Sequence, residues 1–282
     1  MKILVPTDFS NNSIQALEYA THLAKKLKAS LCLLHVYKLA VGADLKNNNE
    51  LGKLFSGREK TENTQLNSLS EKINKTEKLT CDWINKQGKT VDVILEKIKE
   101  KKPALVIMGT KGASGIKKSM MGSNTSRVIE KSPCPVIAVP EMNRRTKISK
   151  IVFATEYLKY DFEVIKFLVK LAKPFKASID VIHIADGELT RFNEEDNINQ
   201  FKLSVDKKIR YEAMTYHLLF GKNTEDRLLH YPEKVSADLL VLSTKHRNTF
   251  QNFFNKSLTG KISFHSTVPI LSFPVKASYP MF

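Results

Sequence analysis

The feature that most constrains the fold of this 282-residue chain is that its sequence repeats. The stretch 2–8, KILVPTD, returns at 150–156 as KIVFATE. The same shift carries the apolar run 33–36, LLHV, onto 181–184, VIHI. Two matches at one shift indicate a duplicated structural unit. The length also exceeds that of a typical single domain, so we expect two domains in tandem.

A later match shows where the two copies differ in length. Residues 104–111 correspond to 238–245 at a shift about 14 residues smaller, so the second copy has lost a segment. We expect the lost segment to be part of a loop within 38–67, which is long, polar and rich in Asn and Lys. The stretch 141–149 is polar and reads as an exposed linker. The predicted domains are residues 1–142 and residues 148–276.

Short apolar runs alternate with segments of helical periodicity in each copy, which is the pattern of βαβ units. Ser10 is a plausible N-cap for the first helix, and further helical faces lie within 91–98, 125–129 and 164–171. The sequence therefore predicts an α/β fold with a five-stranded, mostly parallel sheet in each copy. The expected strands of the first copy are 3–5, 31–35, 79–84, 105–108 and 136–139.

Apolar runs, cysteines and net charge indicate in which compartment the protein lies and which partners it could bind. No apolar run is long enough to span a membrane, and Asp8 interrupts the N-terminal apolar stretch, so we expect a cytoplasmic protein. Three widely spaced cysteines predict neither a disulfide framework nor a zinc site. The formal net charge of +16 admits phosphorylated ligands, nucleic acid or a membrane surface as partners and does not select among them.

Ligands of open parallel sheets bind at the carboxyl ends of the strands, where helix N-termini offer free N–H groups to anions. Gly109 and Gly112 follow the fourth predicted strand, and glycine allows a phosphate chain to approach the backbone. Gly122 and Ser123 open the next helix. Asp8 follows the first strand and could accept hydrogen bonds from ribose or help to bind a metal ion. Taken singly, the same residues could serve only as turn glycines and a helix cap.

The spacing of these residues resembles the ATP-binding signature of the universal stress protein family, G-x2-G-x9-G-[S/T]. Gly109, Gly112, Gly122 and Ser123 match every position, and 6–8, 35–36 and 133–139 fit the flanking pattern. The resemblance covers both halves of the chain. It implies Rossmann-like domains with strand order 3-2-1-4-5, adenine recognised by the backbone at Val36, and ribose bound by Asp8.

The residues predicted to contact the nucleotide share the carboxyl edge of the first sheet. They are Pro6, Thr7, Asp8, Val36, Met108, Gly109, Lys111, Gly112, Gly122, Ser123, Asn124 and Thr125. The expected cofactor is ATP, or ADP or AMP, with Mg²⁺ as an optional companion. No catalytic and no metal-ligating residue is predicted.

The second copy departs from the signature. Its equivalent positions hold Ser243, His246, Lys256 and Ser257, and Glu156 replaces the aspartate at the ribose position. Side chains in place of three glycines would crowd a phosphate path. We therefore expect the second copy not to hold ATP in the same way, which predicts one nucleotide per chain.

Three functions follow as alternatives. The first is a stress-response protein that binds adenine nucleotide in its N-terminal domain, with the C-terminal domain as a pseudo-symmetric partner. The closing strands 136–139 and 270–273 would then pair within the chain, and a homodimer is a further option. The second is slow ATP hydrolysis, for which no general base is evident. The third, nucleic-acid binding through the basic surface, has no recognition motif to support it. His35 and His183 each end an apolar run alone and are expected to be buried strand-end residues rather than metal ligands.

Overall fold

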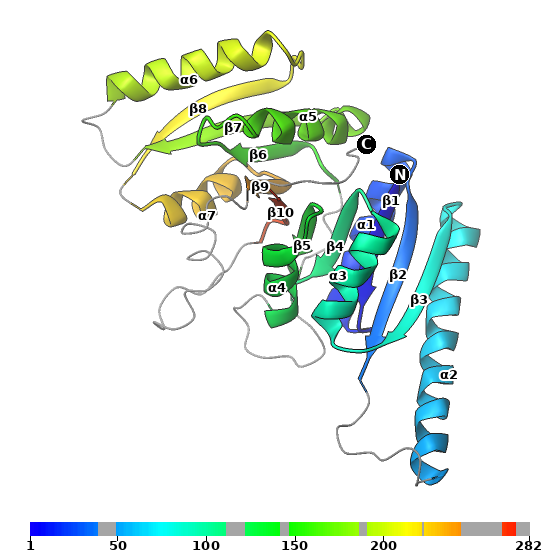
Figure 1. The fold of residues 1–282 in the computed structure, drawn as a ribbon. Helices are drawn as coiled ribbons and strands as arrows, with labels where there is room; N and C mark the ends of the chain where they lie inside the picture. Colours follow the sequence, from blue (N-terminus) through cyan, green and yellow to red (C-terminus); the bar gives the residue numbers. More distant parts are fainter. Residues whose placement is uncertain are drawn as a thin grey trace.

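The computed structural model describes residues 1–38, 49–110, 122–141, 147–185, 191–221, 223–243 and 267–274. Ten strands in this part of the chain form one sheet (Figure 1). Its strand order is β3-β2-β1-β4-β5-β10-β9-β6-β7-β8. The first half contains β1 (Lys2–Thr7), α1 (Asn11–Leu27), β2 (Ser30–Tyr37), α2 (Asn49–Lys72), the π-helical turn η1 (Ile73–Glu77), β3 (Cys81–Gln87), α3 (Thr90–Lys101), β4 (Leu105–Gly109), α4 (Ser123–Lys131) and β5 (Val136–Val139).

The second half repeats this order of strands and helices. It contains β6 (Lys150–Ala154), α5 (Asp161–Ala172), the 3-10 turn η2 (Lys173–Phe175), β7 (Ser178–Ala185), α6 (Arg191–Asp206), β8 (Met214–Phe220), α7 (Thr224–Lys234), β9 (Leu239–Ser243) and β10 (Ile270–Phe273). The strands within each half are parallel. The predicted α/β class and the order 3-2-1-4-5 are confirmed in both halves.

The two five-stranded halves meet at β5 and β10, which are antiparallel neighbours with Ile137 opposite Leu271. Both side chains are fully buried. Because β5 and β10 run in opposite directions, a pseudo-two-fold axis relates the two halves. The carboxyl ends of the strands, where ligands bind in such sheets, therefore face opposite ways in the two halves.

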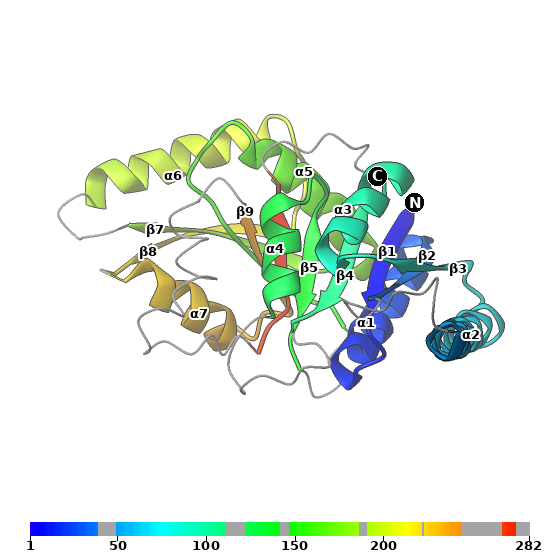
Figure 2. The same ribbon diagram turned by 60° about the horizontal axis from the view of Figure 1, so that its bottom comes forward.

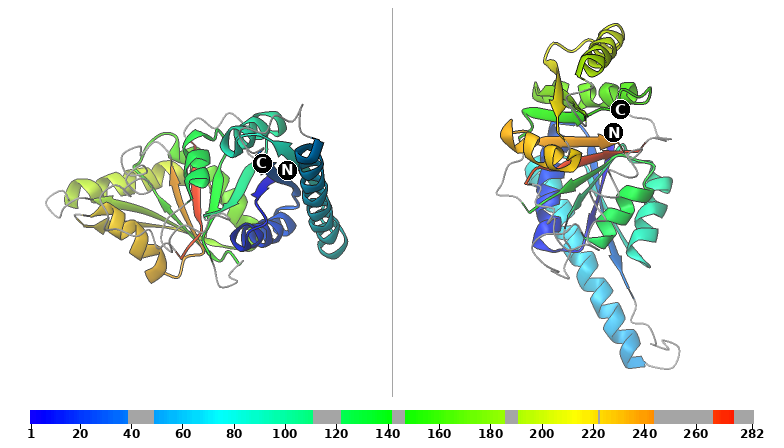
Figure 3. Two further views of the ribbon diagram at one scale, coloured as in Figure 1. Left: turned by 90° about the horizontal axis from the view of Figure 1, so that it is seen from below. Right: turned by 90° about the vertical axis from the view of Figure 1, so that its left-hand side faces the viewer.

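Helices cover both faces of the sheet (Figure 2). The helices α1, α2, α5 and α6 contribute to the apolar cluster on one face, and α3, α4 and α7 contribute to the cluster on the other. Each cluster includes residues of both halves, for example Ile107 and Val241 on one face. The core is therefore continuous across the whole sheet, and the α2 helix extends beyond it at one end (Figure 3).

Helix α2 corrects one prediction. We expected 38–67 to be a loop, but α2 begins at Asn49 and the chain stays helical to Lys72. The helix is mostly polar but has a narrow apolar stripe. In this stripe Leu66 is fully buried, and Ile73 in the following π-turn is nearly so. Burial of this stripe stabilises a helix that propensity alone does not indicate. The shorter α6, of 16 residues against 24 in α2, accounts for much of the length lost in the second copy.

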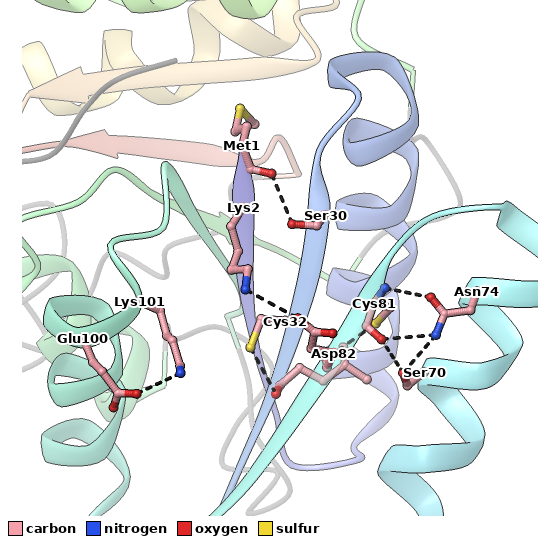
Figure 4. Close-up of polar contacts among 11 residues, drawn as sticks. Met1, Lys2, Ser30, Cys32, Ser70, Asn74, Cys81, Asp82, Glu100 and Lys101 are labelled. Atoms are coloured by element: carbon pink, nitrogen blue, oxygen red, sulfur yellow. Dashed lines mark hydrogen bonds and ion pairs between the residues drawn. The ribbon is translucent and has the colours of Figure 1, made fainter.

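The edge strand β3 begins later than predicted, at Cys81 instead of residue 79, and ends at Gln87. Its outer edge is held by the end of α2 and η1 (Figure 4). The Asn74 side chain accepts from the Cys81 amide at 2.8 Å and donates to the Cys81 carbonyl at 3.2 Å. The Ser70 hydroxyl donates to the same carbonyl at 2.6 Å. These side chains take the place of a neighbouring strand at this point.

The linker prediction is only partly tested, because residues 142–146 lie outside the described part of the chain. Ile148, which we placed in an exposed linker, is fully buried. It belongs to the apolar cluster on the α1 face, so the second unit begins to contribute to the core before β6 starts.

Candidate functional site

A cavity of about 300 Å³ lies at the carboxyl ends of β1, β2 and β4, on the face covered by α3 and α4. The ends of β1 and β4 are the point where the strand order of the first half reverses, which is where ligands of open α/β sheets bind. The cavity is lined by Pro6, Thr7, Asp8, Ser13, Leu34, Val36, Thr90, Ile94, Met108, Gly109, Gly122, Ser123, Asn124 and Thr125. Ten of the twelve predicted contact residues are in this set.

The other two predicted residues, Lys111 and Gly112, lie outside the described residues. Four lining residues were not predicted: Ser13, Leu34, Thr90 and Ile94. Leu34 lies two positions before Val36 on the same face of β2, so strand alternation could have indicated it. Thr90 and Ile94 lie one helical turn apart at the start of α3, and only the packing of this helix over β2 brings them to the cavity.

The cavity has an apolar part and a polar part. Leu34, Val36, Ile94 and Met108 line it with aliphatic and thioether groups. The start of α4 supplies backbone amides and the Ser123 hydroxyl. Such a division matches the chemistry of a ligand with an apolar ring at one end and an anion at the other.

Gly109 is required by its neighbours. A Cβ at this position would lie 2.3 Å from Asn12 Oδ1 and 2.9 Å from the Asn12 carbonyl oxygen, both too short for a side-chain carbon. The end of β4 and the start of α1 therefore approach each other more closely than any other residue would permit.

The start of α4 presents its amides without a capping side chain among the described residues. Gly122 is the N-cap, and no side-chain hydrogen bond closes this end. Ser123 and Asn124 are exposed at the first two helical positions. Uncapped N–H groups at a helix N-terminus attract anions, which is the arrangement that a phosphate group requires.

Two of the predicted nucleotide contacts, Thr125 and Thr7, form hydrogen bonds within the protein that shape the site. The buried Thr125 hydroxyl donates to the Gly109 carbonyl at 2.8 Å, which joins α4 to the end of β4. Because its proton is committed, this hydroxyl cannot also donate to a phosphate oxygen. The Thr7 hydroxyl contacts Ser13 Oγ at 3.0 Å and accepts from the Phe9 amide at 3.1 Å, so it shapes the loop after β1.

Asp8 lies exposed at the rim of the cavity, between Thr7 and the start of α1. Its Oδ1 accepts from the Ser10 amide at 3.1 Å and from the Ser10 hydroxyl at 2.6 Å. Ser10 in turn caps α1, as predicted, by accepting from the Ser13 amide at 3.3 Å. The Asp8 carboxylate is thus oriented by the helix start.

The equivalent place in the second half is bridged by its own side chains. Tyr160, at the position of Asn12, has its hydroxyl 2.9 Å from the hydroxyl of Ser243, at the position of Gly109. Ser243 is fully buried, and burial raises the pKa of Tyr160 to about 12. The helix α5 begins at Asp161, two residues later than the equivalent point of α1.

Asp161 closes the loop after β6. The buried carboxylate replaces Ser13 of the first half, and its Oδ2 accepts from the Thr155 hydroxyl at 2.7 Å. The same oxygen accepts from the amides of Glu156 and Leu158 at 3.2 and 3.1 Å. Backbone donors of this loop are therefore directed to an internal anion. The other substituted positions, His246, Lys256 and Ser257, lie outside the described residues.

Both predicted strand-end histidines are buried, as expected. His35 Nδ1 lies 2.8 Å from the Thr7 carbonyl oxygen and His183 Nδ1 lies 2.8 Å from the Thr155 carbonyl oxygen. A carbonyl only accepts, so Nδ1 carries the proton in each ring. Within the described residues no group of three potential ligands could hold a metal ion.

The fold defines a doubly wound α/β protein of the Rossmann-like class, with a cavity at the switch point of the first half. Comparison with known proteins identifies the family. The sequence profile described as "Universal stress protein family" matches residues 1–140. The chain is 34% identical to Universal stress protein YxiE of Bacillus subtilis over 146 residues, which covers 49% of this chain and 97% of that protein. The chain belongs to the universal stress protein family.

Two further similarities extend this result. Universal stress protein MJ0577 of Methanocaldococcus jannaschii is 32% identical over 164 residues, covering 50% of this chain and 96% of that protein. The crystal structure of a universal stress protein from Archaeoglobus fulgidus superposes with a TM-score of 0.73 at 18% identity and covers 97% of this chain and 96% of that one. The latter likeness concerns the fold, and it includes both halves. No helix in the described part of the chain is long and apolar enough to cross a membrane.

Proposed function

We propose that the chain is a cytoplasmic stress-response protein that binds one adenine nucleotide, ATP by first preference, in its N-terminal unit, residues 1–142. The observation that carries this proposal is the cavity at the ends of β1 and β4, with apolar walls beside the uncapped start of α4. Leu34, Val36 and Met108 would flank the adenine ring. The Gly122 amide donates to the Thr110 carbonyl, so the amides at Ser123 and Asn124 would bind phosphate oxygens, and Asp8 would accept from the ribose hydroxyls.

The residues present fit such a ligand. A Cβ at Gly109 would collide with Asn12, so the backbone at this point is kept bare, and the first turn of α4 leaves its N–H groups available. A bound nucleotide would supply the negative charge that these donors lack. Mg²⁺ would be held mainly by the phosphate oxygens, and Asp8 is the one acidic side chain among the described lining residues that could assist.

We propose that the C-terminal unit, residues 148–276, acts as a pseudo-symmetric partner and does not bind a nucleotide in the same way. The Tyr160 and Ser243 bridge and the internal anion Asp161 support this assignment, because they use the space and the donors that a ligand would need. The β5 and β10 ladder would make the pairing of the two units permanent.

Isothermal titration with ATP tests the proposal on the full chain. Asp8→Ala should weaken ATP affinity by about tenfold, as expected for loss of charge-assisted hydrogen bonds. Glu156→Ala, at the matching position of the second half, is the control and should leave affinity unchanged. Equal effects of both substitutions, or no binding by the wild type, would refute the assignment.

The enzyme alternative is tested on the same samples. Among the described residues that line the cavity, Asp8 is the sole acid, and its Oδ1 is engaged by Ser10. No single observation favours hydrolysis. Single-turnover assays should show bound ATP that persists, whereas release of phosphate abolished by Asp8→Ala would establish a slow hydrolase.

A further inference from the structure

A path of buried polar contacts leads from the loop of the cavity to helix α2. It starts at the Thr7 carbonyl, which accepts from His35 Nδ1 at 2.8 Å. His35 Nε2 lies 3.5 Å from Glu62 Oε1 on α2. Arg58 Nε, one turn earlier on α2, donates to the same Glu62 oxygen at 2.9 Å. The His35 and Glu62 side chains are each only 9% exposed.

The chemistry of this path makes the His35 contact with α2 conditional on the position of one proton. The Thr7 carbonyl fixes the Nδ1 proton, so Nε2 faces the Glu62 carboxylate. The contact is attractive only when a proton lies on Nε2 or on the carboxyl group. Because both groups are buried, the contact is less screened than a surface ion pair.

The same histidine holds the loop from its other side. The ring of Phe9 packs on the ring of His35 with a centroid distance of 4.6 Å. Phe9 has a φ of 61°, a left-handed conformation that is strained for a bulky residue and persists only when surrounding contacts hold it. The segment from Thr7 to Phe9, which presents Asp8 to the cavity, is therefore shaped by His35 at two points.

We propose that His35 is a positioning residue that couples the nucleotide site to α2. It holds the loop that carries Asp8, and it joins this loop to Glu62, so that nucleotide binding and the seating of α2 stabilise each other. Such coupling is reciprocal by thermodynamic necessity. The inference rests on the proposed binding of nucleotide by the N-terminal unit and adds to it the element through which occupancy of the site would be communicated.

The second half offers a matched control within the same chain. His183 donates to the Thr155 carbonyl, packs on Tyr157 at 4.3 Å and lies 3.6 Å from Glu194 on α6. Tyr157 has a φ of 60°, as Phe9 does. The architecture is thus repeated beside a site that is bridged by its own side chains. Substitution of His183 should perturb the fold as substitution of His35 does, without altering nucleotide binding.

Two substitutions separate the two contacts of His35. The amide nitrogen of Asn lies near the place of Nδ1, so His35→Asn keeps a donor to Thr7 and loses the contact with Glu62. The longer His35→Gln places its amide near Nε2, so it keeps a contact with Glu62 and loses the bond to Thr7. Titration calorimetry with ATP and amide hydrogen exchange of residues 57–72 are then measured for the full chain.

In the wild type, ATP should slow exchange across residues 57–72 of α2. His35→Asn should bind ATP within about threefold of the wild type yet lose this protection, and His35→Gln should bind about tenfold more weakly, as expected for one lost hydrogen bond of the loop. His183→Asn and His183→Gln should change neither quantity. Glu62→Met, which keeps the length of the side chain but offers no hydrogen-bond partner to Nε2, should reproduce the loss of protection if a His35 variant does not fold.

The outcomes separate the inference from the proposed function. Tight ATP binding by the wild type with unchanged exchange in α2, or with full affinity in His35→Gln, would overturn the coupling and leave the nucleotide site standing. Equal losses from the His35 and His183 variants would reduce both histidines to structural residues. Absence of ATP binding by the wild type would overturn both proposals.

Discussion

At the residue scale, the two halves differ most clearly at the end of the fourth strand of each unit, where the first half has Gly109 and the second has Ser243. The glycine is predictable from the spacing of the motif. The reason for it is not, because the close approach of Asn12 depends on how α1 packs on β4. Tyr160 was not predicted because its partner Ser243 lies 83 residues away, at the end of β9, where only the fold brings the two together. Asp161 bonds within its own loop, to residues three to six positions earlier, in a contact that no motif marks.

Gly109→Ala tests the close approach. The new Cβ would displace Asn12 and the start of α1, so we expect a loss of stability of about 1–3 kcal/mol, typical of overpacking. ATP affinity should fall as well, by about tenfold, because the displaced end of β4 lines the cavity; a tenfold loss corresponds to 1.4 kcal/mol of binding free energy. Urea unfolding and titration calorimetry measure the two effects.

The matched control is Ser243→Ala. It removes the bond to Tyr160, at a cost of about 1 kcal/mol, and should not change ATP affinity. A Gly109→Ala variant as stable and as competent as the wild type would contradict the account of this position.

Buried thiol and phenol groups predict an alkaline limit of stability. Burial raises the pKa of Cys81 from 9.0 to about 11 and that of Tyr160 from 10.0 to about 12. Since both pKa values are raised by folding, the unfolded chain loses these protons first. The stabilising contribution is complete below about pH 9 and is lost as pH rises toward 12.

The free energy of unfolding, measured by urea titration from pH 8 to pH 11, should therefore decrease steadily above pH 9. Cys81→Ser should flatten the first part of this decrease. A free energy of unfolding that stays constant over the interval in the wild type would contradict the prediction.

At the element scale, the strands and most helices can be predicted from the sequence, because their buried faces appear as apolar runs or as apolar residues at three- and four-residue spacing. Helix α2 was missed, because Leu66, Leu69 and Ile73 recur at helical spacing but stand in a long polar stretch that reads as a loop. The start and the end of β3 were also predicted incorrectly. Its start is defined by Asn74 and Ser70 on a π-helical turn, a contact that no local pattern reveals.

Asn74→Ala tests the role of this turn. The substitution leaves the Cys81 amide without its side-chain partner, while the carbonyl keeps its bond from Ser70, so we expect a loss of about 1–3 kcal/mol in the free energy of unfolding. Faster hydrogen exchange in β3 should accompany it, with ATP affinity unchanged.

Asn67→Ala, in the preceding helix α2, serves as the control, because the Asn67 side chain donates to the exposed Glu71 at 2.8 Å. Its effect should stay within about 0.5 kcal/mol. Equal effects of the two substitutions would show that η1 does not secure the edge of the sheet.

At the scale of the whole molecule, the duplication visible in the sequence becomes one continuous sheet with one apolar cluster on each face. The repeat predicts two similar units. It does not predict that their cores merge, because this depends on side chains such as Ile137 and Leu271 at the junction.

Leu271→Ala tests this continuity. Truncation of a fully buried leucine should lower the free energy of unfolding by about 2–5 kcal/mol. Because the cluster spans both halves, hydrogen exchange should accelerate in β5 as well as in β9. Acceleration limited to β9 and β10 would show that the two units are energetically independent.

The central claim is that one half of the molecule holds a nucleotide and the other half is closed by its own side chains. Native mass spectrometry of the purified full chain, incubated with a saturating excess of ATP, tests it most directly. We predict a mass increase of one nucleotide per chain that Glu156→Ala retains and Asp8→Ala weakens. Two nucleotides per chain, or none, would contradict the account.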